Sequence, residues 1–334
     1  MTTESLTNWI PIRVYWQDAQ LLVDWCRFDH DGFREPFFDD TVQRLLRRPF
    51  NLLFRRQTPV ERLGDLCASR PGLSPAGFIF HMSRCGSTLM AQMLAALPQN
   101  VVISEPDPID SVLRAHYKDP AIADEQRTEW LRGVVSALGQ QRTPEQAHLF
   151  VKFDSWSIVE LPLIRRAFPS VPWVFLYRNP VEVLASHLRQ RGVHMVPGMI
   201  EPQLFGLTGA QLAEMRAEEY CARVLGTVCK IALRHGQEAN GLLVNYTDLP
   251  QALWSSVAAH FGLSWSAAER SILADAARRD SKNPWQEYQT PASSPAAKAV
   301  VHEVCAQWVL PAYERLEDLR LARGSMCSSN AATS

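Results

Sequence analysis

The sequence lacks the features that mark several classes of protein. Its seven cysteines are scattered and include no C-x-x-C pair, which argues against a disulfide framework or a zinc knuckle. No run approaches the roughly 18 consecutive apolar residues that span a bilayer. Residues 1–11 lack the cationic start and apolar run of a signal peptide. We therefore expect a cytoplasmic protein with no structural metal.

An excess of charge of either sign is also absent. The 34 basic and 35 acidic residues give a formal net charge of −1 at pH 7. This balance provides no global attraction to nucleic acid or to an anionic membrane surface. We expect neither as a partner, and any anion site must be local. With 334 residues, 46% of them hydrophobic, the chain can bury the core of a globular enzyme.

Short apolar runs alternate with helical patterns from residue 76 onward. The sequence predicts buried strands at residues 77–82, 149–151, 173–177 and 241–246, each followed by a helix. Strands that alternate with helices in this way form a parallel sheet covered on both faces. We expect an α/β protein with a P-loop-like, three-layer fold, in which helices flank a central parallel sheet.

A break rich in Pro, Gly and Ser at residues 71–75 separates this pattern from the preceding chain. We predict an N-terminal extension over residues 1–72 that packs on the active-site cleft, a catalytic domain over 73–322 and a disordered tail over 323–334. The extension contains aromatic clusters and the basic pair Arg47-Arg48, to which the sequence assigns no chemistry.

The first predicted strand leads into the loop Ser83-Arg84-Cys85-Gly86-Ser87-Thr88, which precedes a helix. Such a loop offers free backbone N–H groups and the positive end of the helix dipole to an anion. A phosphate or sulfate site and an ordinary capped turn both fit this pattern. The triphosphate loop G-x-x-x-x-G-K-[ST] carries a lysine that is missing here, which disfavours a kinase or NTPase.

Two motifs carry a family resemblance. Residues 83–89 resemble the 5′-phosphosulfate loop of sulfotransferases that use 3′-phosphoadenosine 5′-phosphosulfate (PAPS). Residues 177–186 resemble their 3′-phosphate motif, in which a strand-end arginine precedes a helical serine by eight residues, as Arg178 precedes Ser186. The chain is similar to a bacterial PAPS-dependent sulfotransferase. Its arginine-type loop is closer to the Golgi and tyrosylprotein branch than to the cytosolic branch.

The resemblance implies PAPS as co-substrate, adenosine 3′,5′-bisphosphate as product and no metal. It adds two looser matches to the two motifs, one at the strand end of Tyr246 and one in the basic loop 278–282. The residues expected to bind the cofactor are Arg84, Cys85, Gly86, Ser87, Thr88, Arg178, Ser186, Tyr246, Ser281 and Lys282.

In-line sulfuryl transfer needs a base at the acceptor hydroxyl and cations near the leaving phosphate. We expect Arg84 and Lys152 to provide the positive charge. Glu105 is similar in position to the catalytic glutamate of the tyrosylprotein branch, and partial burial would raise its pKa toward neutrality. The rival base is Asp154, which stands where cytosolic members carry a catalytic histidine. We expect His187 and His194 on helix surfaces.

The expected acceptor is a small molecule or a glycan that carries a hydroxyl. Two alternatives from other classes remain open. One is a P-loop kinase or NTPase-like enzyme, and the other is a non-catalytic nucleotide-binding relict of the same fold.

Overall fold

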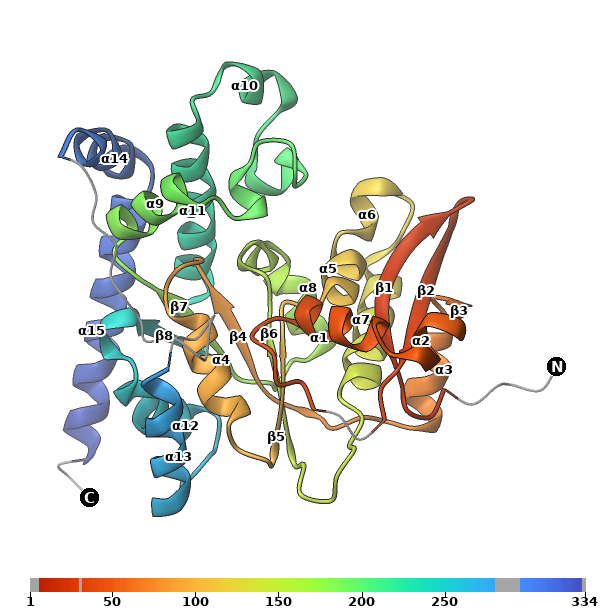
Figure 1. Ribbon diagram of the computed structural model, residues 1–334. Coiled ribbons are helices and arrows are strands. Elements are labelled where there is room, and N and C mark those ends of the chain that lie inside the picture. Colours follow the sequence, from red (N-terminus) through yellow and green to blue (C-terminus); the bar gives the residue numbers. More distant parts are fainter. Residues whose placement is uncertain (1–5, 30–31, 280–294, 332–334) are drawn as a thin grey trace. The chain divides into compact units, whose positions relative to one another are not determined.

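We analysed a computed structural model of the chain, which describes residues 6–29, 32–279 and 295–331 (Figure 1). The chain folds into two compact units. The first contains the described residues of Met1–Ile79, Thr88–Pro172 and Ser264–Glu287, and the second contains those of Phe80–Ser87, Trp173–Leu263 and Tyr288–Ser334. These units do not follow the predicted boundary after residue 72, because the N-terminal segment shares one core with the elements that come after it.

The first unit combines a small antiparallel sheet, the start of the large parallel sheet and several helices. Its elements are β1 (Trp9–Gln17), β2 (Gln20–Arg27), α1 (Phe38–Leu46), α2 (Pro49–Leu53), β3 (Arg56–Pro59), α3 (Arg62–Ser69), most of β4 (Pro75–His81), all but the first residue of α4 (Ser87–Ala95), β5 (Asn100–Ser104), α5 (Asp107–Leu113), α6 (Ala115–Lys118), α7 (Asp124–Leu138), β6 (His148–Lys152), the 3₁₀ helix η1 (Ser155–Glu160), α8 (Leu161–Ala167) and α13 (Ala267–Ala277).

The second unit contains the end of β4 and the two remaining parallel strands. Its other elements are β7 (Trp173–Tyr177), α9 (Pro180–Arg189), the 3₁₀ helices η2 (Val193–Met195) and η3 (Pro202–Phe205), α10 (Gly209–Glu214), α11 (Ala217–His235), β8 (Gly241–Asn245), the 3₁₀ helix η4 (Tyr246–Asp248), the π-helical stretch η5 (Leu253–Val257), α12 (Ala258–His260), α14 (Pro295–Trp308) and α15 (Leu310–Ala331).

The large sheet has the strand order β5-β6-β4-β7-β8. All residues of β5, β6 and β7 except His148, the first residue of β6, are buried, as expected for parallel strands that are covered on both faces. The predicted strands at residues 77–82, 149–151, 173–177 and 241–246 all lie in this sheet. The predicted α/β class, with helices flanking a central parallel sheet, is confirmed.

The N-terminal segment packs on helices of its own unit. Strands β1 and β2 pair antiparallel, β3 joins the edge of β2, and β1 contacts α5 and α7 (Figure 1). Helix α3 packs against α7 so closely that a Cβ on Gly133 would lie 2.7 Å from the Cβ of Leu63. Residues 6–29 and 32–69 are therefore an integral part of the first unit.

Helix α11 is the centre of the second unit, where it contacts α9, α14 and α15. The last helix, α15, runs through residues 323–331, which the sequence predicted to be a disordered tail. A helix that has already formed gains one hydrogen bond for each residue added, so small and polar residues can prolong it. No helix among the described residues is long and apolar enough to cross a membrane.

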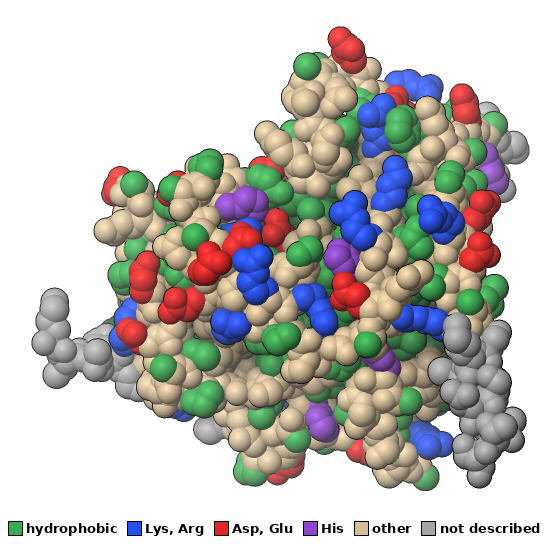
Figure 2. Space-filling view, turned by 180° about the vertical axis from the view of Figure 1, so that it is seen from behind, with side chains coloured by type: hydrophobic (Ala, Val, Ile, Leu, Met, Phe, Trp, Pro, Cys, Tyr) green, Lys and Arg blue, Asp and Glu red, His purple; other side chains and the backbone are tan. Residues whose placement is uncertain are grey.

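On the face of the molecule drawn in Figure 2, Lys and Arg side chains are interspersed with Asp and Glu side chains. This mixture agrees with the near-zero net charge of the sequence. An excess of charge of one sign is therefore expected only in small groups of neighbouring residues.

The contact between α3 and α7 generates a first prediction. Gly133→Ala should lower the free energy of unfolding by about 1–3 kcal/mol, because the added methyl group meets the backbone of Leu63 and neither helix can move aside freely. Urea unfolding followed by tryptophan fluorescence measures the change. Gly209→Ala, where a Cβ meets nothing within 4 Å, is the matched control. Equal stability of both variants would contradict the packing described.

Candidate functional site

In the first unit, two strand ends bring an acidic and a basic residue together. Strands β5 and β6 pair in parallel with Ser104 opposite Lys152, so the residue that follows β5 lies beside the end of β6. The backbone N–H of Glu105 donates to the carbonyl of Lys152 at 2.7 Å. Glu105 adopts a left-handed conformation with φ of 55°, which is rare for a residue with a side chain. Such conformations cluster at functional sites.

Lys152 is fully buried, with 0% of its surface exposed. Its ammonium group pairs with the carboxylate of Glu105 and lies 5.2 Å from the centre of the Phe37 ring. A buried ammonium without such partners would be strongly destabilising. The contact with Glu105 therefore compensates the burial of the ammonium, and the N-terminal segment contributes Phe37 to the surroundings of Lys152.

Asp154 follows the same strand and is half-buried. Desolvation, together with the negative charges of Asp110 and Glu105, raises the pKa of Asp154 well above its usual range, against the lowering effect of Lys152. Asp110 itself is held by Arg114 at 2.6 Å and by the indole N–H of Trp156 at 2.7 Å. The raised pKa that the sequence predicted for Glu105 stays a prediction, and the shift described here belongs to Asp154.

In the second unit, the loop after β4 has an unusual backbone. Ser83, Arg84 and Gly86 all have positive φ, at 72°, 51° and 84°. Left-handed residues other than glycine cost on the order of 1–3 kcal/mol each, so the surrounding contacts must hold them. The N–H of Ser83 donates to Nδ1 of His81 at 3.0 Å, and the thiol of Cys85 donates to the carbonyl of Leu176 at 3.1 Å.

Helix α9 is attached to this loop by a buried histidine. Nδ1 of His187 accepts from the N–H of Gly192 at 3.4 Å, which leaves Nε2 as the donor toward the Ser83 hydroxyl at 3.1 Å. Ser186, the predicted 3′-phosphate ligand, is the preceding residue on the same helix. The expectation that His187 and His194 lie on helix surfaces was wrong, since both are buried and their rings are in contact.

Arg84 is a half-buried cation with positive charge beside it. Its Nη2 donates to the carbonyl of Gln190 at 2.9 Å. Desolvation and the nearby charge of Arg189 lower the pKa of Arg84. Two cations this close, one of them partly desolvated, form a location at which a bound anion would be stabilised.

Tyr246 contacts both of the motifs that are far apart in the sequence. The guanidinium of Arg178 lies 4.2 Å from the centre of the Tyr246 ring. On the loop side, a Cβ added to Gly86 would lie only 2.8 Å from the ring, so glycine is required there by space as well as by φ. Arg178 also pairs with Glu182, one turn later in α9, with an Nε to Oε2 distance of 2.7 Å.

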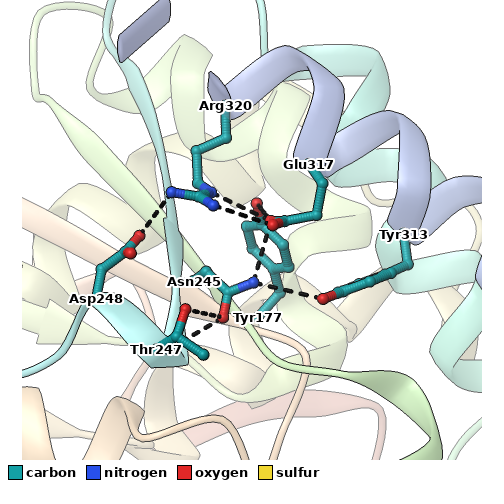
Figure 3. Close-up of polar contacts among 7 residues, drawn as sticks. All are labelled: Tyr177, Asn245, Thr247, Asp248, Tyr313, Glu317 and Arg320. Carbon is teal, nitrogen blue, oxygen red and sulfur yellow. Dashed lines mark hydrogen bonds and ion pairs between the residues drawn. The ribbon is translucent and has the colours of Figure 1, made fainter. Parts of the chain in front are cut away.

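A buried polar network holds the ends of β7 and β8 to helix α15 (Figure 3). Strands β7 and β8 pair in parallel with Tyr177 opposite Asn245. Both side chains donate to the same carboxylate of Glu317, Tyr177 through its hydroxyl and Asn245 through its amide at 3.0 Å. The network comprises Tyr177, Asn245, Thr247, Asp248, Tyr313, Glu317 and Arg320.

The network fixes the residues that come directly before Arg178 and Tyr246. Desolvation raises the pKa of Glu317, but hydrogen bonds from Arg320 and Tyr177 outweigh it and lower that pKa. Arg320 closes the network by donating to Asp248 at 2.9 Å. The charged carboxylate is thus fully satisfied, and the two strand ends share one anchor.

Comparison with known proteins identifies the group to which the chain belongs. A model of the sulfotransferase family matches residues 75–267. The chain belongs to the sulfotransferase family. This match includes the loop of Arg84, both strand ends of the first unit, and the Arg178 and Tyr246 motifs. No curated protein is significantly similar to this sulfotransferase.

Several solved structures are similar to it at low identity. The sulfotransferase STF1 from Mycobacterium tuberculosis H37Rv is 16% identical, with 75% of this chain and 80% of that chain covered and a TM-score of 0.44. The sulfotransferase STF9 from Mycobacterium avium is 10% identical, with 75% and 80% covered and a TM-score of 0.45. Mouse sulfotransferase SULT7A1, complexed with PAP, is 13% identical, with 79% and 94% covered and a TM-score of 0.41.

The structure divides the predicted site residues between the two units. Glu105, Lys152 and Asp154 lie together in the first unit, to which Thr88 also belongs. The second unit contains the remaining described residues, namely Arg84, Cys85, Gly86, Ser87, Arg178, Ser186 and Tyr246. Cys85 is fully buried, which leaves its backbone rather than its thiol for contact with a ligand. Ser281 and Lys282 lie outside the described residues.

Sequence reasoning missed three neighbours of these residues. Phe37 faces Lys152, His187 holds Ser83, and Glu182 pairs with Arg178. Only Glu182 had a signal, because its spacing of four residues from Arg178 on a predicted helix favours an ion pair. Within the described part of the chain, no group of three or more His, Cys, Asp or Glu side chains could hold a metal ion.

The raised pKa of Asp154 predicts how stability depends on pH. A carboxyl group with a higher pKa in the folded state stabilises the protein below its unfolded pKa, and this contribution is lost as the pH rises through the folded pKa. Asp154→Asn replaces the carboxyl group with an amide that does not ionise, so the variant does not lose this stability as the pH rises. The variant should melt at a higher temperature than the parent at pH 8, and the two should converge below about pH 4.

Thermal melts at intervals across this pH range measure the difference. Asp119→Asn is a matched control, because it makes the same substitution at another aspartate of the first unit. Melting temperatures of the Asp154 variant and the parent that differ by the same amount at every pH would contradict the assignment.

Proposed function

We propose that this sulfotransferase moves a sulfuryl group from PAPS to a hydroxyl of a small molecule or a glycan. The acceptor oxygen forms a bond to sulfur while the bond from sulfur to the 5′-phosphate oxygen breaks, and the acceptor proton passes to a carboxylate. The products are the sulfate ester and adenosine 3′,5′-bisphosphate. Membership of the sulfotransferase family supports sulfuryl transfer and does not favour a P-loop kinase or NTPase.

One observation carries the choice of PAPS as donor. Tyr246 lies between Gly86 of the phosphosulfate loop and Arg178 of the 3′-phosphate motif, in contact with both. An aromatic ring between an anion-binding loop and an arginine suits a nucleotide with phosphates at both its 5′ and 3′ positions. In this proposal Tyr246 packs against the adenine, and Arg178 and Ser186 bind the 3′-phosphate.

The loop residues then bind the 5′-phosphosulfate. Arg84 contributes charge toward the leaving phosphate, and the N–H groups near Gly86, Ser87 and Thr88 provide hydrogen bonds. The two left-handed residues before Gly86 support this role, because strain of this kind persists where a fixed geometry is needed. No metal is needed for these steps.

Glu105 is the base that we propose for the acceptor proton. Its position at the strand end, beside the buried ammonium of Lys152, supports this role. Asp154 is the alternative, because desolvation raises its pKa above the usual range and so makes it a stronger base. A cytoplasmic location, expected from the sequence, remains a prediction.

The donor can be tested by binding. Adenosine 3′,5′-bisphosphate should raise the melting temperature in the presence of a metal chelator, since the proposed contacts are all side chains and backbone N–H groups. ATP with magnesium should have little effect. Mass spectrometry of reactions with PAPS and a panel of alcohols and sugars should then show products that have gained one sulfuryl group. Stabilisation by ATP with magnesium alone would instead favour the kinase alternative.

Arg178 and Glu182 provide a paired test of the 3′-phosphate site. Arg178→Gln should weaken binding of the bisphosphate by about 10- to 100-fold, the loss of a charge-assisted contact of roughly 1.5–3 kcal/mol. Glu182→Gln should strengthen it, because the arginine no longer has to exchange one anionic partner for another. Isothermal titration calorimetry measures both. If neither variant changes the dissociation constant, the second motif does not bind the cofactor.

The base can be assigned by turnover. Glu105→Gln should lower kcat by about 10²–10⁴-fold with little change in bisphosphate affinity, because the amide cannot take the acceptor proton. Asp154→Asn should lower it much less. Circular dichroism melts check that the glutamine variant is folded, as expected if its amide oxygen accepts a hydrogen bond from Lys152. Loss of turnover in Asp154→Asn, with Glu105→Gln nearly intact, would move the base to Asp154.

A further inference from the structure

The first unit carries a cluster of exposed apolar side chains on and after the short helix α2. Leu53 is 77% exposed, Leu52 58%, Phe54 57% and Phe50 38%. These four residues, which we call the apolar tip, include half of the large hydrophobic side chains that are exposed among the described residues. Contiguous apolar exposure of this kind marks an interaction surface more often than single exposed residues do.

The apolar tip is held in a fixed conformation. Asn51, at its centre, is buried and donates to the carbonyls of Arg27 and Leu45, each at 3.0 Å. Its side-chain oxygen accepts from the N–H of Arg27, also at 3.0 Å. The residues on either side of Asn51 therefore point outward from a turn that is anchored to β2 and α1. The hydrogen bonds of Asn51 therefore fix the conformation in which Leu53 and its neighbours are exposed.

Arginines surround the apolar tip. Residues 41–60 contain five arginines and no acidic residue. Arg44 pairs with Glu35, and Arg27 of β2 pairs with Asp29, so the positive charge at the tip comes from Arg47, Arg48, Arg55 and Arg56. Arg47 and Arg55 are exposed, and Arg48 and Arg56 are half-exposed. The guanidinium of Arg27 lies 4.7 Å from the centre of the Phe50 ring, and that of Arg56 lies 4.6 Å from the ring of Trp9. Arginine and aromatic side chains together fit the boundary between water and a lipid bilayer.

We propose that the apolar tip docks on an anionic phospholipid surface, with its leucine and phenylalanine side chains inserted among the acyl chains and the arginines against the headgroups. The positive charge of the arginines is complementary to anionic headgroups, which favours an anionic surface over a neutral one. Leu53 is 77% exposed, so most of its side chain is available to insert among acyl chains. In a symmetric dimer the same arginines would face one another, which disfavours a second copy as occupant.

This surface was not foreseen from the composition. A net charge of −1 predicted no attraction to membranes, but that sum averages over the whole chain. Electrostatic attraction falls off within a Debye length of roughly 10 Å, so a lipid surface responds to the local charge. Peripheral docking needs no membrane-spanning helix. The proposal is also independent of the identity of the acceptor.

The test is cosedimentation of the full chain with vesicles. Vesicles with about 30 mol% phosphatidylglycerol in phosphatidylcholine should bind the protein, and pure phosphatidylcholine should bind it much less. Raising NaCl from about 0.1 M to about 0.5 M should weaken the binding. Leu53→Ser/Phe54→Ser should lower the partition coefficient by at least about 10-fold. Arg47→Gln/Arg55→Gln should lower it by about fivefold for each arginine removed.

Matched controls distinguish the tip from general surface effects. Met199→Ser removes an apolar side chain that is 59% exposed in the second unit. Lys230→Gln/Arg234→Gln removes two exposed charges from α11. Both should bind vesicles as the parent does. Circular dichroism melts confirm that each variant is folded.

Three results would overturn the proposal. One is equal binding to anionic and neutral vesicles, and another is binding that survives both pairs of substitutions in the tip. The third is a dimer in sedimentation velocity that Leu53→Ser/Phe54→Ser dissociates while the parent binds no vesicles, which would assign the tip to a second copy of the chain.

Discussion

The parallel register of neighbouring strands is the constraint on which both groups of functional residues depend. In the first unit, Ser104 lies opposite Lys152, and this brings the next residue, Glu105, against a lysine that the sheet has buried. In the second unit, Tyr177 lies opposite Asn245, and the residues that follow are Arg178 and Tyr246. A shift of one residue in either pairing would separate these partners and turn their side chains to the other face.

The strands position these residues, and a set of buried polar contacts holds them there. Glu317 receives hydrogen bonds from both Tyr177 and Asn245, so one carboxylate of α15 fixes two strand ends. His187 acts similarly between α9 and the strained loop at Ser83. Left-handed residues and buried charges are destabilising by themselves, and they persist where neighbouring contacts leave the chain no alternative. In this sulfotransferase such features gather around the residues proposed to bind and react.

Prediction from the sequence succeeded where the signal is local. The buried strands were recognisable as apolar runs, and Asn179 and Pro180 were correctly predicted to start α9, where the Asn179 side chain accepts from the N–H of Val181 at 3.0 Å. Prediction failed where contacts with residues far away in the sequence determine the surroundings of a side chain. His187 was expected on the surface because it is polar, yet it lies on the same face of α9 as Val183 and Leu184 and is buried against the loop after β4. The pKa of Asp154 is raised by desolvation and by the charges of Asp110 and Glu105, an environment that residues from several segments create.

The sequence by itself determined the class of the protein. Apolar runs that alternate with helical patterns indicated the α/β class, and the resemblance of two motifs to those of sulfotransferases indicated the family that the match over residues 75–267 shows. Only the tertiary structure decided which partners these residues have. Phe37 over Lys152 and His187 against Ser83 are contacts between segments that are distant in the sequence and meet in space. Burial and charge are properties of that arrangement, so no reading of composition or spacing could have supplied them.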